Sequence, residues 1–261
     1  MRNHKQATIF AALICAILLF GYLPAALAAS TTPYFAYLPM VIKQGPSTPA
    51  PTNTPVPTQT LTPAPTATSI PPGVQILQNH SYHVDSIDYL HVVGEVLNNT
   101  GNHLRFVKIT ANFFNGGGQL LGTKFTYIHL SNLPAWDKTC FDLGLPEPSG
   151  WSYYQFESPT YWTDGQPLLN LAVLNDSGSY KPTYGWYKII GQVRNDHGVR
   201  VEYVSPVSTL YNASGTVVDC KFTYVNSTHL DPGQMSAFEM TFSRRNYSDV
   251  ALYRLQVDGN P

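Results

Sequence analysis

The densest group of side chains that could do chemistry is His80, His83, Asp85, Asp88 and His91, all within one short segment. Imidazole and carboxylate groups are common zinc ligands, so such a segment could in principle hold a metal ion. The later segment that repeats this part of the chain keeps none of these side chains. We therefore expect a solvated polar hairpin here and no metal site.

Other candidates for catalysis lack the context that their chemistry needs. Ser205 and Ser236 do not lie in the Gly-x-Ser-x-Gly pattern of a strained nucleophile elbow. Glu147 and Glu157 are separated by turn residues, and no spacing fixes the carboxylate distance that glycoside hydrolysis requires. The sequence predicts a protein that is not an enzyme, with no catalytic residue and no cofactor.

Aromatic residues crowd the segment 142–167 and the position just before it. Aromatic faces can stack on sugar rings or on the side chains of a partner protein. The alternative is that these residues form the closing strands of a β-sandwich and its packing against a neighbouring module. The predicted binding surface consists of Trp136, Trp151, Tyr153, Tyr154, Tyr161 and Trp162.

An internal repeat organises the part of the chain that carries these residues. When the chain is aligned with itself at an offset of 97 residues, 13 of the 48 positions in 94–141 are identical, without a gap. Chance would give roughly three identities, so the pattern indicates a duplication. What the copies share is glycine, turn asparagine, apolar residues and one Lys-Phe-Thr-Tyr stretch, and none of these is a catalytic acid, base or nucleophile.

Each copy reads as short strands divided by turns. β-Branched stretches run into Asn-x-x-Gly turns, and 107–113 and 204–210 each lead into a hairpin loop. Pro206 lacks an amide donor, which predicts an edge strand or a bulge at that position. Several short strands per ~90 residues predict an all-β protein of two tandem immunoglobulin-like β-sandwich modules, residues 74–168 and 169–261.

The second copy also resembles a known family. Leu210-Tyr211-Asn212-Ala213-Ser214-Gly215, followed by Leu230-Asp231-Pro232-Gly233 and then Phe238, is similar to the FxLYD domain of bacterial envelope proteins. The resemblance implies an immunoglobulin-like sandwich without catalytic residues. The first copy departs from the pattern, because Leu133-Pro134-Ala135-Trp136 replaces the Leu-x-Pro-Gly turn.

Two cysteines lie in the repeated region, Cys140 in the first copy and Cys220 in the second. At the offset of 97, their counterparts are Ala237 and Thr123, so neither copy has an internal pair. An oxidising compartment would permit a bridge between the modules. Two separately buried thiols are the simpler expectation.

The N-terminal region carries export signals. Arg2 and Lys5, an apolar run and the small residues Ala26-Leu27-Ala28 predict a signal peptide over 1–28. The apolar run is shorter than the ~20 residues that cross a bilayer, so the only membrane contact expected is through this segment before cleavage. A short hydrophobic segment, 29–43, follows, in which 34–43 is either a docking peptide or a collapsed tail. Residues 44–73 contain nine Pro and eight Thr, which predicts a disordered linker.

The net charge of the chain and the distribution of its basic residues bear on which kinds of partner it can bind. Loss of the two basic residues of the signal leaves 13 basic against 16 acidic side chains, a net charge of −3. No cluster of Lys or Arg exists to follow a phosphate backbone, so we expect no nucleic-acid partner. The sequence predicts an extracellular or cell-surface structural or protein-interaction module, whose partner is an envelope protein. The alternative is a carbohydrate-binding module that uses the aromatic cluster to bind a glycan.

Overall fold

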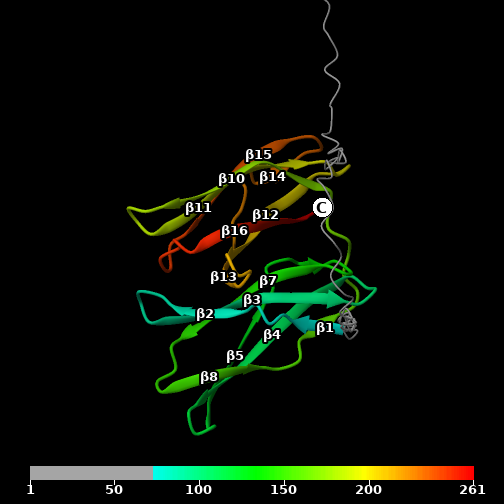
Figure 1. Ribbon diagram of the computed structural model, residues 1–261. Helices are drawn as coiled ribbons and strands as arrows, with labels where there is room; N and C mark the ends of the chain where they lie inside the picture. Colours follow the sequence, from blue (N-terminus) through cyan, green and yellow to red (C-terminus); the bar gives the residue numbers. More distant parts are fainter. Residues whose placement is uncertain (1–72) are drawn as a thin grey trace, which may run out of the picture. The chain divides into compact units, whose positions relative to one another are not determined.

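The computed structural model describes residues 73–261, so the predicted signal peptide, hydrophobic segment and linker up to residue 72 lie outside the described residues. Within the described range the chain is entirely β (Figure 1). The part of the chain described here has no helix that could cross a membrane. The strands are β1 (Gly73–Ile76), β2 (Ser81–Val84), β3 (Tyr89–Asn99), β4 (Leu104–Asn115), β5 (Leu120–Tyr127), β6 (Asn132–Leu133), β7 (Lys138–Pro146), β8 (Trp151–Phe156), β9 (Thr160–Trp162), β10 (Leu171–Lys181), β11 (Trp186–Asn195), β12 (Val201–Asn212), β13 (Val217–Phe222), β14 (His229–Leu230), β15 (Met235–Phe242) and β16 (Val250–Asn260).

The strands form four antiparallel sheets, two in each half of the described chain. Sheet A has the order β1-β3-β2 with β7 paired to β3, and sheet B has the order β5-β4-β6 with β8 and β9 paired to β4. Sheet C has the order β10-β11-β15, and sheet D has the order β13-β12-β14 with β16 paired to β12. The all-β fold expected from the sequence is confirmed, and its sheets are those of two β-sandwich modules, which we call the first module (sheets A and B) and the second module (sheets C and D).

The strand boundaries follow the sequence repeat. Five strands of the first module begin 97 residues before a strand of the second, at Tyr89 and Trp186, Leu104 and Val201, Leu120 and Val217, Asn132 and His229, and Lys138 and Met235. These strands pair with one another in the same way in both modules, and the outer strands β10 and β16 take the places of the pairs β1/β2 and β8/β9. The offset therefore identifies structurally equivalent positions, which allows one module to serve as the reference for the other.

The shared glycines and phenylalanines explain part of the repeat. Gly94 lies opposite Phe141 in the β3–β7 ladder, and Gly191 lies opposite Phe238 in the β11–β15 ladder. A Cβ atom on either glycine would lie 2.8 Å from the facing phenylalanine ring, closer than carbon atoms approach. Each buried ring therefore requires the glycine beside it.

The turn asparagines are structural as well. Asn98 and Asn195 are fully buried at the ends of β3 and β11. The Nδ2 atom of Asn98 donates to the carbonyl of Leu133 at 3.2 Å, and that of Asn195 donates to the carbonyl of Leu230 at 2.8 Å. Each side-chain amide thus joins the two sheets of its own module, because it reaches from one sheet to the short edge strand of the second sheet. It also satisfies backbone groups that burial would otherwise leave unpaired.

Pro206 lies in β12, which is flanked by β13 and β16 and is not an edge strand. The register of β12 against β16 shifts between Glu202 and Ser205, directly before the proline. Of the two predicted alternatives, an edge strand or a bulge, the structure has the bulge. The bulge lets the chain pass the position where proline has no amide hydrogen to donate.

Candidate interaction surface

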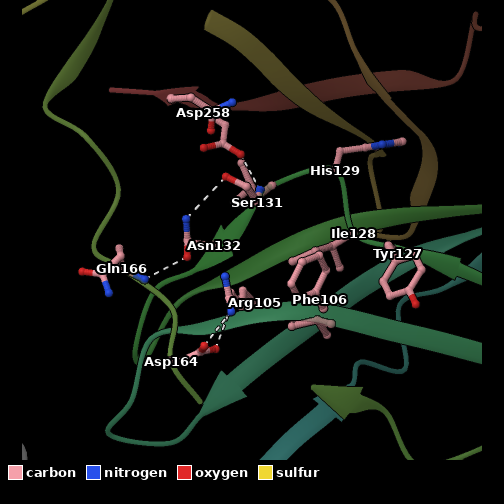
Figure 2. Close-up of a pocket in the computed structure, with 13 residues that line it drawn as sticks. Arg105, Phe106, Tyr127, Ile128, His129, Ser131, Asn132, Asp164, Gln166 and Asp258 are labelled. Carbon is pink, nitrogen blue, oxygen red and sulfur yellow. Dashed lines mark hydrogen bonds and ion pairs between the residues drawn. The ribbon is translucent and has the colours of Figure 1, made fainter. Parts of the chain in front are cut away.

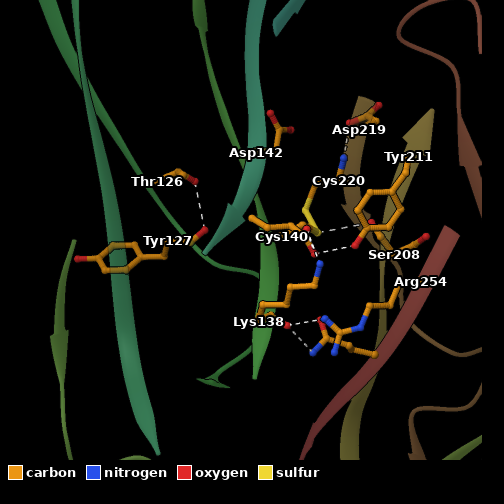
Figure 3. The surroundings of a disulfide bond; sticks show 12 residues. Thr126, Tyr127, Lys138, Cys140, Asp142, Ser208, Tyr211, Asp219, Cys220 and Arg254 are labelled. Atoms are coloured by element: carbon orange, nitrogen blue, oxygen red, sulfur yellow. Dashed lines mark hydrogen bonds and ion pairs between the residues drawn. A yellow bond between two sulfur atoms is a disulfide. The ribbon is translucent and has the colours of Figure 1, made fainter. Parts of the chain in front are cut away.

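A disulfide joins Cys140 on β7 of the first module to Cys220 on β13 of the second, with the Cα atoms 5.8 Å apart (Figure 3). The expectation of two separately buried thiols is wrong. Sequence spacing could not show the bridge, because each cysteine has its partner in the other module, 80 residues away. Val207 and Cys220 also belong to an apolar cluster otherwise made by the first module, so the core continues across the contact.

A buried carboxylate also stabilises this contact between the two modules. Glu95 on β3 is fully buried and accepts hydrogen bonds from Tyr211 Oη at 2.6 Å, Lys138 Nζ at 2.8 Å and Asn79 Nδ2 at 2.8 Å. Of these donors, Tyr211 comes from β12 of the second module. A buried charge needs several donors to offset the loss of water, and here one of them comes from the other module.

A second charged cluster lies beside the disulfide. Arg244 of the second module pairs with Asp142 of the first and lies 3.5 Å from Asp219. Burial alone would raise the pKa of Asp142, but the His91 hydrogen bond and the Arg244 charge outweigh it and hold this pKa below its usual value. Burial raises the pKa of Asp219, although Tyr247 donates a hydrogen bond to it at 2.5 Å. The pair of Arg244 and Asp142 joins the two modules, and Asp219 and Tyr247 of the second module lie beside it.

The histidine-rich hairpin is only partly solvated. His83 and His91 are buried, and their rings stack with centroids 5.1 Å apart. This corrects the expectation of a solvated polar hairpin, which holds only near the tip, where Asp85 Oδ1 accepts the backbone amides of Ile87 and Tyr89. Among the residues that the structure describes, no group of three or more His, Cys, Asp or Glu side chains fits a metal ion.

The outward face of sheet D is covered by the first module. Tyr211, Val207 and Cys220 all lie in the contact described above, and Arg254 donates to Asp137 Oδ1 at 2.8 Å. In Figure 1, β13 lies beside β3 and β7. At the offset of 97, the counterparts of the first three are Phe114, Thr110 and Thr123 on sheet B of the first module. No part of the described chain covers this equivalent face in the same way.

This uncovered face of sheet B, the open face, is rich in aromatic rings. Phe125 is 51% exposed and Tyr127 is 47% exposed, and both lie on β5. Their rings meet edge to face at 6.0 Å, and Lys108 Nζ lies 4.9 Å from the centre of the Phe125 ring. The residues of the open face are Phe106, Lys108, Phe114, Leu120, Phe125, Tyr127, Tyr153 and Trp162.

The six residues of the predicted aromatic surface fall into two groups in the structure, three packed against the core and three exposed. Trp151 and Tyr154 on β8 pack against a buried cluster of the first module, and Tyr161 on β9 packs against the other. The Tyr154 hydroxyl also lies 2.7 Å from His80 Nδ1, and burial raises the pKa of this tyrosine to about 12. These three side chains belong to the closing strands of the first sandwich.

The other three predicted residues are exposed, but not together. Tyr153 stacks on Phe114 with centroids 5.1 Å apart, and Trp162 meets Phe106 edge to face at 4.9 Å, so both lie on the open face. Trp136 lies in the turn before β7 instead, with a positive φ of 63°. Its counterpart is Gly233, with a φ of 79°, so tryptophan stands where the other module has glycine.

Sequence reasoning missed Phe106, Phe125 and Tyr127 as surface residues. The signal was present, because the Lys-Phe-Thr-Tyr stretch is one of the longest identities between the copies. In a strand, residues two apart lie on the same side, so Phe125 and Tyr127 share a face. Whether that face is core or surface depends on which sheet packs against it.

A strained backbone position recurs on these sheets. Phe106 has a φ of 50° and its counterpart Tyr203 a φ of 51°, both at a bulge beside the closing strand. A bulky residue with positive φ costs about 1–3 kcal/mol. Phe106 is 52% exposed and Tyr203 63%, so neither ring is held in this conformation by full burial. Both modules thus keep an exposed ring in a costly conformation.

A groove of about 960 Å³ runs from the open face to the junction of the modules (Figure 2). Phe106 and Tyr127 line one end, and Asn132, Gln166 and Asp258 line the other. Between them, Arg105 makes two hydrogen bonds with Asp164, at 2.7 and 2.6 Å, and its guanidinium lies 5.1 Å from the rings of Phe106 and Trp162. The groove therefore offers an apolar wall, planar polar groups and a fixed cation.

No family model matches the sequence, and no curated protein matches it. Among solved structures, the chain is similar to a transglutaminase of red sea bream, at 12% identity and a TM-score of 0.22. It is also similar to the exo-chitosanase of Amycolatopsis orientalis, at 13% identity and a TM-score of 0.24. The alignments cover 70% and 69% of this chain but only 29% and 25% of those structures. Scores this low carry no argument about fold or function.

Proposed function

We propose that the protein is a non-catalytic interaction module displayed outside the cell, in which two rigidly joined sandwiches present the open face to an envelope partner. The observation that carries this proposal is the contrast between equivalent faces: one is fastened by a disulfide and buried ion pairs, and the other is uncovered and aromatic. Exposed clusters of large apolar side chains are typical of protein contacts. The FxLYD resemblance agrees with a scaffold role at the envelope.

The predicted export and linker support the same proposal. A leader over 1–28 and a Thr/Pro-rich spacer would present the modules away from the cell surface. The buried carboxylates Glu95 and Asp142 also have partners across the contact between the modules, and Asp219 accepts a hydrogen bond from Tyr247 of its own module. The role left for the molecule is binding through its surface.

Binding of the purified full chain to isolated cell envelopes of the producing organism tests this function. Phe125→Ala combined with Tyr127→Ala removes two rings of the open face, and we expect at least a tenfold weaker interaction. Tyr203→Ala combined with Tyr224→Ala removes two exposed rings of the second module, at the positions equivalent to Phe106 and Tyr127, and should leave binding unchanged. Equal loss in both variants, or a chain that stays in the cytosol after fractionation, would contradict the proposal.

A second candidate function is glycan binding in the groove. Its support is the lining of the groove in Figure 2, where the Phe106 ring lies beside Arg105 and the same groove also holds Tyr127, Asn132 and Asp164, because sugars stack on rings and pair their hydroxyls with planar polar groups. On a glycan array, Phe106→Ala and Tyr127→Ala, which remove the two rings that line the groove, should each weaken a signal that Trp151→Ala, a change in the closing strand, leaves in place. An array without any signal removes this candidate.

A further inference from the structure

The repeat relates the covered contact to two uncovered surfaces of the same chain. In the covered contact, the outward face of sheet D packs against the outward face of sheet A. The open face of sheet B is the counterpart of the first surface, and the outward face of sheet C is the counterpart of the second. The two outward surfaces of the molecule, on sheet B and on sheet C, are therefore each equivalent to one side of a contact that the chain already makes internally.

The apolar residues at the centre of the internal contact have apolar counterparts on the two uncovered surfaces. The internal contact buries a cluster of Val93, Tyr211 and Val217. At the offset of 97, the counterparts are Ile190 on sheet C, and Phe114 and Leu120 on sheet B. Ile190 is 47% exposed and Leu120 is 52% exposed. An apolar trio that is buried between the modules is thus repeated on two separate surfaces, with Ile190 and Leu120 exposed and Phe114 half-buried.

The charged and covalent links of the internal contact are replaced, on the two uncovered surfaces, by residues that would hold a weaker contact. Glu95, the buried carboxylate, becomes Gln192, and Lys138 becomes Met235, which is exposed. Cys140 and Cys220 become Ala237 and Thr123, so no covalent bridge can form. Replacing buried charges by apolar and neutral groups lowers the desolvation cost of burial, and methionine packs well against aromatic rings such as Phe114.

From these correspondences we infer that the partner of the open face is a second copy of this chain, whose sheet C docks on sheet B as sheet A docks on sheet D. This inference rests on the proposed interaction function and names its partner. The two surfaces differ, so the contact is heterologous and each added copy leaves a new open face. Chains would associate head to tail, with the modules continuing the arrangement that the disulfide fixes inside each chain.

Sedimentation of the purified full chain at increasing concentration tests the inference. We expect monomers to pass into dimers and longer species with a dissociation constant between about 1 µM and 1 mM. Ile190→Lys disables the sheet C surface and Leu120→Lys disables the open face, so each variant alone should stay monomeric. A 1:1 mixture of the two retains one intact contact and should form dimers and nothing longer.

Ile87→Lys is the matched control, because Ile87 is exposed at the tip of the β2–β3 hairpin and belongs to neither surface. It should associate like the wild type. A wild-type chain that stays monomeric at about 1 mM overturns the inference, as does a mixture that stays monomeric. If the wild type is monomeric but Phe125→Ala with Tyr127→Ala still loses envelope binding, the partner is another molecule and the proposed function stands.

Discussion

The outward faces of sheet D and sheet B descend from one repeated pattern but have opposite environments. On sheet D, Tyr211 donates a hydrogen bond to the buried carboxylate of Glu95 in the first module. Cys220 forms a disulfide with Cys140 of the same module. On sheet B, Phe114 and Thr123 occupy the same positions without such partners. The difference shows that the sandwich itself does not need this face to be covered. The residues that cover it are additions to a shared scaffold.

Removal of the disulfide should have the largest effect on this comparison. Cys140→Ala with Cys220→Thr gives each position the residue of the other module, and we expect the free energy of unfolding to fall by about 4 kcal/mol, because the bridge closes a long loop. Guanidinium unfolding measures the loss. Wild type unfolded under strong reductant should lose a similar amount, and a loss below about 1 kcal/mol would show that the bridge adds little to the contact.

Glu95→Ala should destabilise the protein by about 3 kcal/mol, because it leaves the Lys138 ammonium and the Tyr211 hydroxyl without their shared acceptor. The matched variant is Gln192→Ala at the equivalent position of the second module, where the change should stay within about 0.5 kcal/mol. Urea unfolding of both variants gives the comparison. Equal effects would mean that Glu95 acts within its own module and not across the contact.

The covered contact should also weaken in acid because of His83. Burial, followed by the charge of His91, lowers the pKa of His83 from 6.5 to about 4, and neither ring nitrogen has a hydrogen-bond partner. The unfolded chain therefore takes up a proton near pH 6.5 and the folded chain only near pH 4. Between these values protonation favours unfolding, so stability is full above pH 6.5 and falls as the pH drops toward 4.

Unfolding curves of wild type and His83→Phe across this range isolate the effect. We expect the wild type to lose on the order of 2 kcal/mol more than the variant between the two pH values. Asp85 and Asp142, whose pKa values are also lowered, lose their contributions below pH 3.8 in both proteins and cancel in the difference. Parallel curves for the two proteins would show that His83 is not the acid-sensitive group.

The smallest expected effect is at the turn where the modules differ. Trp136 is 66% exposed and holds a positive φ, so Trp136→Gly loses little packing and relieves backbone strain. We expect a gain of about 1 kcal/mol in thermal unfolding experiments. Gly233→Trp, the reverse exchange in the second module, should cost a similar amount. Loss of stability in Trp136→Gly would show that the tryptophan makes contacts that outweigh the strain.

Much of the fold follows from local chemistry that a sequence carries. Turn asparagines and glycines, β-branched stretches and the offset of 97 locate strands to within a few residues, because these signals depend on backbone conformation alone. The predicted linker ended at Gly73, which is instead the first residue of β1. The predicted surface was less complete, since Trp151 and Tyr154 face the core while Phe125 and Tyr127 face out.

By itself, the sequence determined the repeat, the all-β class and the positions of the turns, because each of these depends on residues close together in the chain. Only the tertiary structure decided that Cys140 meets Cys220, that His83 and His91 are buried, and which of two equivalent aromatic faces is covered. The reason is physical: alternation in a strand separates its two sides, but which side meets water depends on the sheets that pack against it. Here those sheets come from the other copy of the repeat.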